Sequence, residues 1–232
     1  MTKELGIVPV MTIDAKTIAK WDDMARRFEV FMQALNPATD EEGRFYHIVS
    51  AIGGAAIPNY WMLRDAHSKD QQNRVAWACR NLLELAVFAE FVIASEVNAT
   101  QFAEDRLIDG HQIACLLLKM EEWEGVDQAQ SNVGPLIAEH VSMMNAEHIT
   151  RKDFTTVASM ATGELKKEFS AVNRLCSKFI HPTAWSLLTA DRGPDRFPQA
   201  SELLCVFGVK YFATISAAFM PHIGEHGLQP RS

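Results

Sequence analysis

The sequence predicts an all-α protein, folded as one bundle of six to eight helices. Prolines number only nine and glycines twelve among the 232 residues, and long stretches contain neither, which favours helices over a many-stranded sheet. Apolar residues recur three and four positions apart along most of the chain, as they do on one face of a helix. Apolar residues make up 48% of the sequence, so a chain of this length can bury a sizeable core.

The first half of the chain is predicted to form four long helices. Asp14 precedes the first apolar repeat and has the side chain of a good N-cap. Gly53-Gly54 and Pro58 are expected to loosen or kink the second helix. The third is apolar nearly all round and is expected at the centre of the bundle. The four helices are expected at about residues 14–35, 39–62, 70–95 and 98–123.

The second half contains the clearest breaks. Residues 124–135 are predicted to form an interior linker, and Pro182 is expected to stop a helix that begins near Gly163. Ser201 is expected to cap the last long helix. Helices are predicted at about residues 135–148, 163–181, 184–188 and 201–220. The whole chain, residues 1–232, is predicted to be a single domain, with the helix in residues 1–37 as an arm appended to it.

Charge and cysteine usage narrow the classes of protein. The formal net charge is −7, whereas proteins that coat duplex nucleic acid are usually basic, so non-specific DNA binding is not expected. The four cysteines lie far apart and form no Cys-x-x-Cys pair, which argues against a disulfide framework or a zinc site. No segment near the N-terminus is typical of a signal peptide. We therefore expect a cytoplasmic protein.

The last helix needs a separate test, because residues 203–220 are long and apolar enough to resemble a membrane span. Lys210 lies at the middle of this segment, where a charge in lipid would be costly. No flanking basic clusters and no second span of this kind are present. A buried bundle helix is therefore predicted, with no membrane association.

The segment from Gly163 to His181 carries the pattern most suggestive of chemistry. Its apolar residues form one stripe, and Lys167, Arg174, Lys178 and His181 lie together on the opposite side. Arg174 and His181 are seven residues apart, close to two full turns, so they are expected to lie in line. The stripe is either an ordinary solvated face or a phosphate site. In the second case arginine would hold the phosphate and histidine would move a proton.

The eight residues from Arg174 to His181, Arg-Leu-Cys-Ser-Lys-Phe-Ile-His, resemble the R-x(4–6)-H signature of HEPN domains, a superfamily of small helical bundles. Asn173-Arg174, Ser177 and His181-Pro182-Thr183 also resemble a bacterial helical family with an S-x-x-x-H-[PG] segment. That family has an upstream R-x-x-x-E helix, which corresponds here to Arg80 and Glu84. A second match to the short signature, Arg106 to His111, would place its two side chains on different faces of a helix.

The resemblance implies a function and an oligomeric state. Catalytic HEPN proteins are typically homodimers that cleave RNA without a metal, at a site made by the arginines and histidines of both subunits. By this resemblance Arg174 and His181 would be the catalytic residues, with Lys167 and Lys178 beside them as binding residues. Many other HEPN domains have no nuclease activity and bind partners or nucleotides.

Arg80 and Glu84 lie one turn apart on the most apolar helix, so they are expected to form a buried ion pair. Such a pair is either structural or part of a binding pocket. No Glu-x-x-His and no His-Glu-x-x-His motif occurs, so no metal site is predicted, and no other cofactor.

Three functions stay open from the sequence. The first is a HEPN-like, metal-independent endoribonuclease of toxin or phage-defence type, acting as a homodimer. The second is a non-catalytic helical binding or interaction module, in which the same residues hold a partner, a nucleotide or merely the fold. The third is a small-molecule enzyme with a pocket at Arg80 and Glu84.

Overall fold

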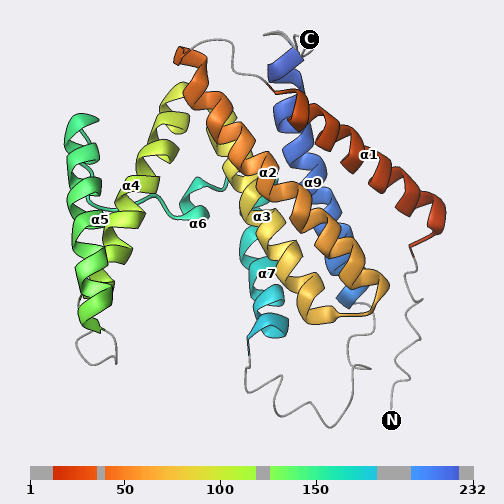
Figure 1. The fold of residues 1–232 in the computed structure, drawn as a ribbon. Helices are drawn as coiled ribbons and strands as arrows, with labels where there is room; N and C mark the ends of the chain where they lie inside the picture. Colours follow the sequence, from red (N-terminus) through yellow and green to blue (C-terminus); the bar gives the residue numbers. More distant parts are fainter. Residues whose placement is uncertain (1–12, 36–39, 119–125, 182–199, 225–232) are drawn as a thin grey trace. The chain divides into compact units, whose positions relative to one another are not determined.

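The structure is a computed structural model that describes residues 13–35, 40–118, 126–181 and 200–224. These residues form eight α-helices and no strand (Figure 1), which confirms the predicted all-α fold. The helices are α1 (Ala15–Ala34), α2 (Asp40–Ser68), α3 (Gln72–Ala94), α4 (Glu96–Leu118), α5 (Val126–Ala146), α6 (Val157–Met160), α7 (Gly163–Ile180) and α9 (Ala200–Gly224).

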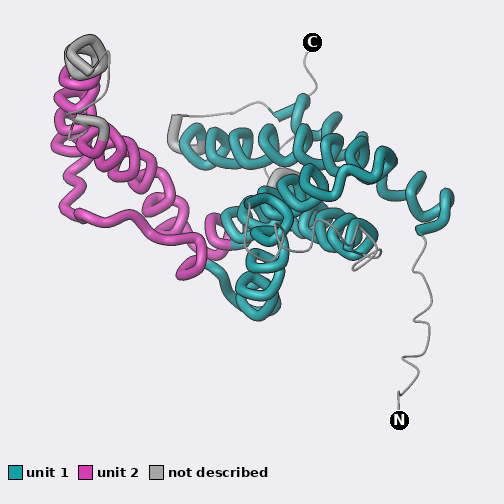
Figure 2. Tube along the Cα trace, turned by 90° about the horizontal axis from the view of Figure 1, so that it is seen from below, with its two compact units in different colours: residues 1–90, 161–232 teal, residues 91–160 magenta. Residues whose placement is uncertain are grey.

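The chain divides into two compact units, which Figure 2 shows in different colours. Unit 1 comprises residues 1–90 and 161–232, and unit 2 comprises residues 91–160. The prediction that the whole chain is one domain stays a prediction. The predicted short helix at residues 184–188 lies outside the described residues.

Unit 1 is built on three helices that contact one another, α1, α2 and α9. In Figure 1 they run side by side, in red, orange and blue. Phe28, Tyr60 and Phe212, one from each helix, are fully buried. The Phe212 ring packs edge-on against Phe28 and lies 4.6 Å from the Tyr60 ring, centroid to centroid. This aromatic cluster shows that α1 is part of the core, so the prediction of an appended arm is wrong for its described residues.

The ends of α1 follow from local chemistry. The Asp14 side chain accepts a hydrogen bond of 2.8 Å from the backbone N–H of Thr17, as predicted for an N-cap. This bond stabilises the carboxylate and lowers the pKa of Asp14. The helix ends at Ala34, and Leu35 has an extended backbone.

Two glycines allow helices of unit 1 to approach closely. A Cβ atom at Gly53 would lie 2.4 Å from Cε of Met32 on α1, and one at Gly208 would lie 2.6 Å from Cδ2 of Leu63 on α2. Gly53 was expected to loosen α2, together with Pro58. Instead α2 is a continuous helix with Pro58 inside it, on an exposed position where the carbonyl freed by the missing N–H can reach water.

α9 is the most apolar helix of the described chain. The segment Ala200–Pro221 is long and apolar enough to cross a membrane. Of its most apolar stretch of 18 residues, 56% is buried inside the structure, as in the core helix of a soluble protein. Lys210 near its middle pairs with Glu168 of α7, and Glu168 also accepts a hydrogen bond of 3.2 Å from Tyr211. The helix begins at Ala200, one residue before Ser201, so Ser201 is its second residue and not its cap.

Unit 2 centres on a hairpin of α4 and α5, which contact each other closely. The predicted linker at 124–135 is wrong from Val126 onward, because α5 begins there and includes Pro135. Gly134 and Pro135 are exposed, and Pro135 lies inside the helix. Gly110 lets the hairpin close, because a Cβ there would lie 2.7 Å from the His140 ring.

Candidate functional site

The two faces of α7 are arranged as the sequence predicts. Leu165, Val172 and Cys176 are buried on its inner side. Lys167, Arg174 and Lys178 are exposed on its outer side, and so is His181 just beyond its end. The helix presents a basic outer face on a protein of net negative charge.

The end of α7 differs in one respect from the prediction. His181 does not continue the last turn, because its backbone is extended, with φ −104° and ψ 140°. The residue before a proline is disfavoured in the helical region, and His181 precedes Pro182. Its N–H still donates to the carbonyl of Ser177 at 3.1 Å, so His181 caps the helix at its negatively polarised end. Helical spacing alone therefore does not fix the direction of the His181 ring.

The basic residues of this outer face differ in how far they are already paired. Lys167 contacts Glu164 at 2.6 Å, in a pair of which both side chains are largely exposed, and such pairs contribute little stability. Among the described residues, Arg174 and Lys178 have no ion-pair partner. Within the described part of the chain, the cationic groups of Arg174 and Lys178 are therefore not engaged by a carboxylate.

Arg80 and Glu84 on α3 form the predicted ion pair, with Nε of Arg80 3.1 Å from Oε1 of Glu84. Their side chains are 32% and 29% exposed, so the pair is only partly buried and not sealed in the core as expected. The i,i+4 geometry accounts for the contact without any ligand. Next to it, Asn81 donates a hydrogen bond of 2.9 Å to Asn59 and ties α3 to α2.

A partly buried polar network in unit 1 was not predicted. Oδ1 of Asp22 accepts hydrogen bonds from the Tyr60 hydroxyl at 2.7 Å and from Nε of Arg64 at 3.0 Å. Burial and the bond to Asp22 raise the pKa of Tyr60. Burial also raises the pKa of the nearby Cys205 thiol, to about 11, so this cysteine is a neutral core residue at physiological pH.

His67, one turn after Arg64, supplies a test of this network. Burial lowers its pKa first and the charge of Arg64 lowers it further, against an opposing effect of Glu202. The unfolded chain therefore takes up the proton at a higher pH than the folded chain, and stability falls as the pH drops below about 6.5. We expect His67→Gln to reduce the loss of unfolding free energy between pH 7 and pH 5, measured by urea denaturation. The exposed His47→Gln should leave that loss unchanged; an equal effect of both variants would contradict the role of burial.

Arg151 of unit 2 is the centre of the densest polar cluster among the described residues. Its Nε and Nη2 donate to Oε2 of Glu104 at 3.2 and 3.0 Å. Its Nη1 donates to Oδ1 of Asp105 at 2.9 Å and to Oγ1 of Thr155 at 3.3 Å, and its Nη2 donates to the carbonyl of Gln101 at 3.1 Å. Four of these five bonds fasten the non-helical segment after α5 to α4, and the fifth, to Thr155, lies within that segment.

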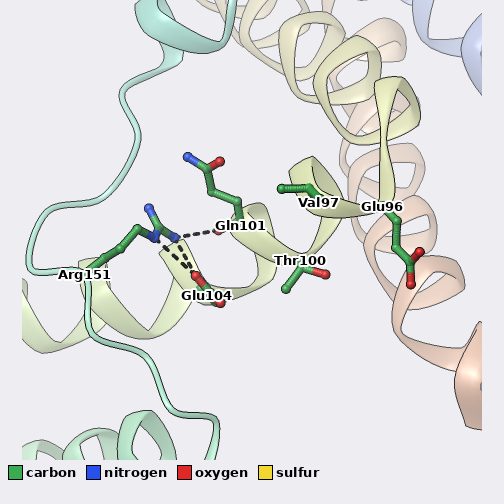
Figure 3. A pocket seen from close by; sticks show the side chains of 6 residues that line it. All are labelled: Glu96, Val97, Thr100, Gln101, Glu104 and Arg151. Carbon is green, nitrogen blue, oxygen red and sulfur yellow. Dashed lines mark hydrogen bonds and ion pairs between the residues drawn. The ribbon is translucent and has the colours of Figure 1, made fainter.

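A pocket of about 440 Å³ lies beside this cluster, within unit 2. Figure 3 shows its lining, with Arg151 turned toward Glu104 and Gln101. The pocket is lined by Glu96, Val97, Thr100, Gln101, Glu104 and Arg151. None of the six residues predicted for a site lines it.

Few features of the sequence point to the Arg151 cluster. Arg151 and its carboxylate partners are 46 and 47 residues apart, and no short motif joins them. The one local sign was the pair of adjacent acids, Glu104-Asp105, on a predicted helix. In the structure Asp105 pairs with Arg151. The described part of the chain holds no group of three potential metal ligands.

No protein-family model, no curated protein and no solved structure matches the chain.

Proposed function

We propose that the protein is a HEPN-like, metal-independent endoribonuclease of toxin or phage-defence type, located in the cytoplasm. The observation that supports it is the outer face of α7, where Arg174 and Lys178 are exposed and without a described ion-pair partner, and where His181 follows at the helix end. A guanidinium binds phosphate through two parallel hydrogen bonds, and an imidazole transfers protons near neutral pH.

The chemistry needs no metal. His181 takes the proton of an RNA 2′-hydroxyl, and that oxygen attacks the adjacent phosphorus. Arg174 stabilises the added negative charge of the five-coordinate phosphorane, and Lys167 and Lys178 hold neighbouring phosphates. The bond from phosphorus to the 5′-oxygen then breaks, and that oxygen takes up the proton from His181, which returns the imidazole to its neutral form. The products are a 2′,3′-cyclic phosphate and a 5′-hydroxyl.

A homodimer fits this scheme, because seven residues correspond to about 10 Å along a helix axis, so Arg174 and His181 of one chain are widely separated. In a dimer Arg174 of one protomer and His181 of the other meet at one phosphate.

The test is cleavage of a single-stranded RNA in EDTA. We expect His181→Ala to lower the rate by about 100-fold or more, the usual contribution of a general acid or base. His181 is exposed, so the melting temperature should change little. The matched control is His47→Ala, which removes another exposed histidine. Cleavage by His181→Ala at the wild-type rate would overturn the assignment.

Binding without cleavage is the second candidate. The observation that favours it is that His181 makes no side-chain hydrogen bond to another described residue, whereas an acid–base histidine is commonly oriented by a partner. In that case Arg174→Ala would weaken RNA binding, while neither it nor wild type would yield a cyclic phosphate. Arg80 and Glu84 would be part of neither mechanism, because their guanidinium and carboxylate already pair with each other.

A further inference from the structure

The pocket of unit 2 offers hydrogen-bond acceptors and negative charge, and almost no free donors. A guanidinium has five N–H groups, and all five of Arg151 are used by Glu104, Asp105, Thr155 and the Gln101 carbonyl. Despite its positive charge, Arg151 therefore has no donor left for an anionic ligand.

The acceptors that remain belong to one line of side chains on α4. Glu96, Thr100 and Glu104 are spaced four residues apart, so they lie along one side of the helix. Glu96 has no ion-pair partner among the described residues, and Oε1 of Glu104 is not used by Arg151. Glu96 lies in the first turn of α4.

The charge around the pocket is not balanced. Three carboxylates, those of Glu96, Glu104 and Asp105, stand against the single guanidinium of Arg151. The side chain of Asp105 is only 10% exposed, and its Oδ2 atom is buried without a hydrogen-bond partner. Asp105 is paired with Arg151 through its other oxygen, so the three carboxylates and the one guanidinium together leave a net charge of −2 beside the pocket. A ligand of this pocket must therefore carry positive charge and donate hydrogen bonds.

The spacing of the acceptors sets the shape of that ligand. Glu96 and Glu104 are eight residues apart, or about 12 Å along the helix axis, with the Thr100 hydroxyl halfway between them. Val97, which is 73% exposed, lies next to this line and offers apolar surface for methylene groups. An extended chain of nine bonds, at about 1.2 Å per bond, spans about 11 Å. A linear triamine such as spermidine has that length, with a secondary ammonium near its middle.

We infer that this pocket binds a linear aliphatic polyamine. One terminal ammonium pairs with Glu96 and the other with Glu104, the central ammonium donates to Thr100, and the methylene groups cover Val97. The inference does not depend on the proposed nuclease function, because the pocket lies in unit 2 and α7 lies in unit 1.

The test is titration calorimetry of the full-length protein, free of nucleic acid, with spermidine and with 1,4-diaminobutane. The shorter diamine reaches only one of the two carboxylates, so we expect it to bind at least about fivefold more weakly than spermidine. Glu96→Gln should weaken the binding of spermidine by about fivefold, which is the effect of losing one ion pair at an exposed site. Thr100→Val should weaken the binding of spermidine but not the binding of the diamine.

The control is Glu139→Gln, which removes one exposed carboxylate of α5 and changes the net charge equally. Spermidine should bind this variant like wild type. An equal loss in Glu139→Gln and Glu96→Gln would show attraction by net charge alone and overturn the inference. So would equal affinities for the two amines, or no measurable heat with spermidine.

Discussion

Phe212→Ala is expected to lower the free energy of unfolding of unit 1 by about 4 kcal/mol, the usual cost of removing a fully buried phenylalanine. Phe212 is 0% exposed and contacts Phe28 and Tyr60, so one ring joins α9 to both α1 and α2. Truncation leaves a cavity that three packed helices cannot close. The measurement is amide hydrogen exchange of α9 peptides, followed by mass spectrometry.

Leu203→Ala is the matched control for this prediction. It removes an apolar side chain from the same helix, but Leu203 is 39% exposed, so we expect a loss of less than about 1 kcal/mol. Equal effects of the two variants would mean that the aromatic cluster is not the centre of the unit 1 core.

Arg151→Ala is expected to destabilise unit 2 by about 2 to 3 kcal/mol, because it removes five hydrogen bonds and leaves Asp105 without its guanidinium partner. This loss of stability is smaller than for a fully buried ion pair, because the Arg151 side chain is 32% exposed. Faster hydrogen exchange in residues 147–156 and in the first turns of α4 is the expected result.

Arg151→Lys separates charge from geometry. An ammonium keeps the positive charge but cannot make the forked contacts to Glu104 and Asp105 together, so we expect an intermediate loss. Exchange rates equal to wild type in Arg151→Ala would show that the cluster does not hold the segment after α5 in place.

Local patterns in the sequence predicted much of the fold. Asp14 could be predicted as an N-cap because this cap needs only a local contact. The Asp14 carboxylate accepts a hydrogen bond from the N–H of Thr17, three residues later. The two faces of α7 were predicted because burial on a helix follows a repeat of 3.6 residues. Both features depend on neighbours within one or two turns.

The wrong predictions concern features that depend on distant partners. Gly134 and Pro135 were expected in a linker, but α5 continues through them on an exposed position beside α4. Arg80 and Glu84 were expected to be buried because their helix is apolar, yet the structure leaves about a third of each side chain exposed. The Arg151 cluster joins residues almost fifty positions apart, and no periodicity in the sequence encodes such a contact.

The outer face of α7 was proposed as the site from the sequence, and in the structure Lys167, Arg174, Lys178 and His181 are all exposed. What the sequence did not indicate is the extended backbone of His181, which is set by the proline that follows. Helical spacing therefore does not place the His181 ring relative to Arg174.

The most direct measurement compares wild-type protein on two oligonucleotides of the same sequence, in EDTA: one RNA, and one with a methyl group on every 2′-oxygen. The 2′-hydroxyl is the proposed nucleophile, so we predict that the RNA is cut to a 2′,3′-cyclic phosphate while the methylated strand is bound but not cut. Cleavage of both strands, or of neither, would contradict the assignment of Arg174 and His181 to metal-independent RNA cleavage.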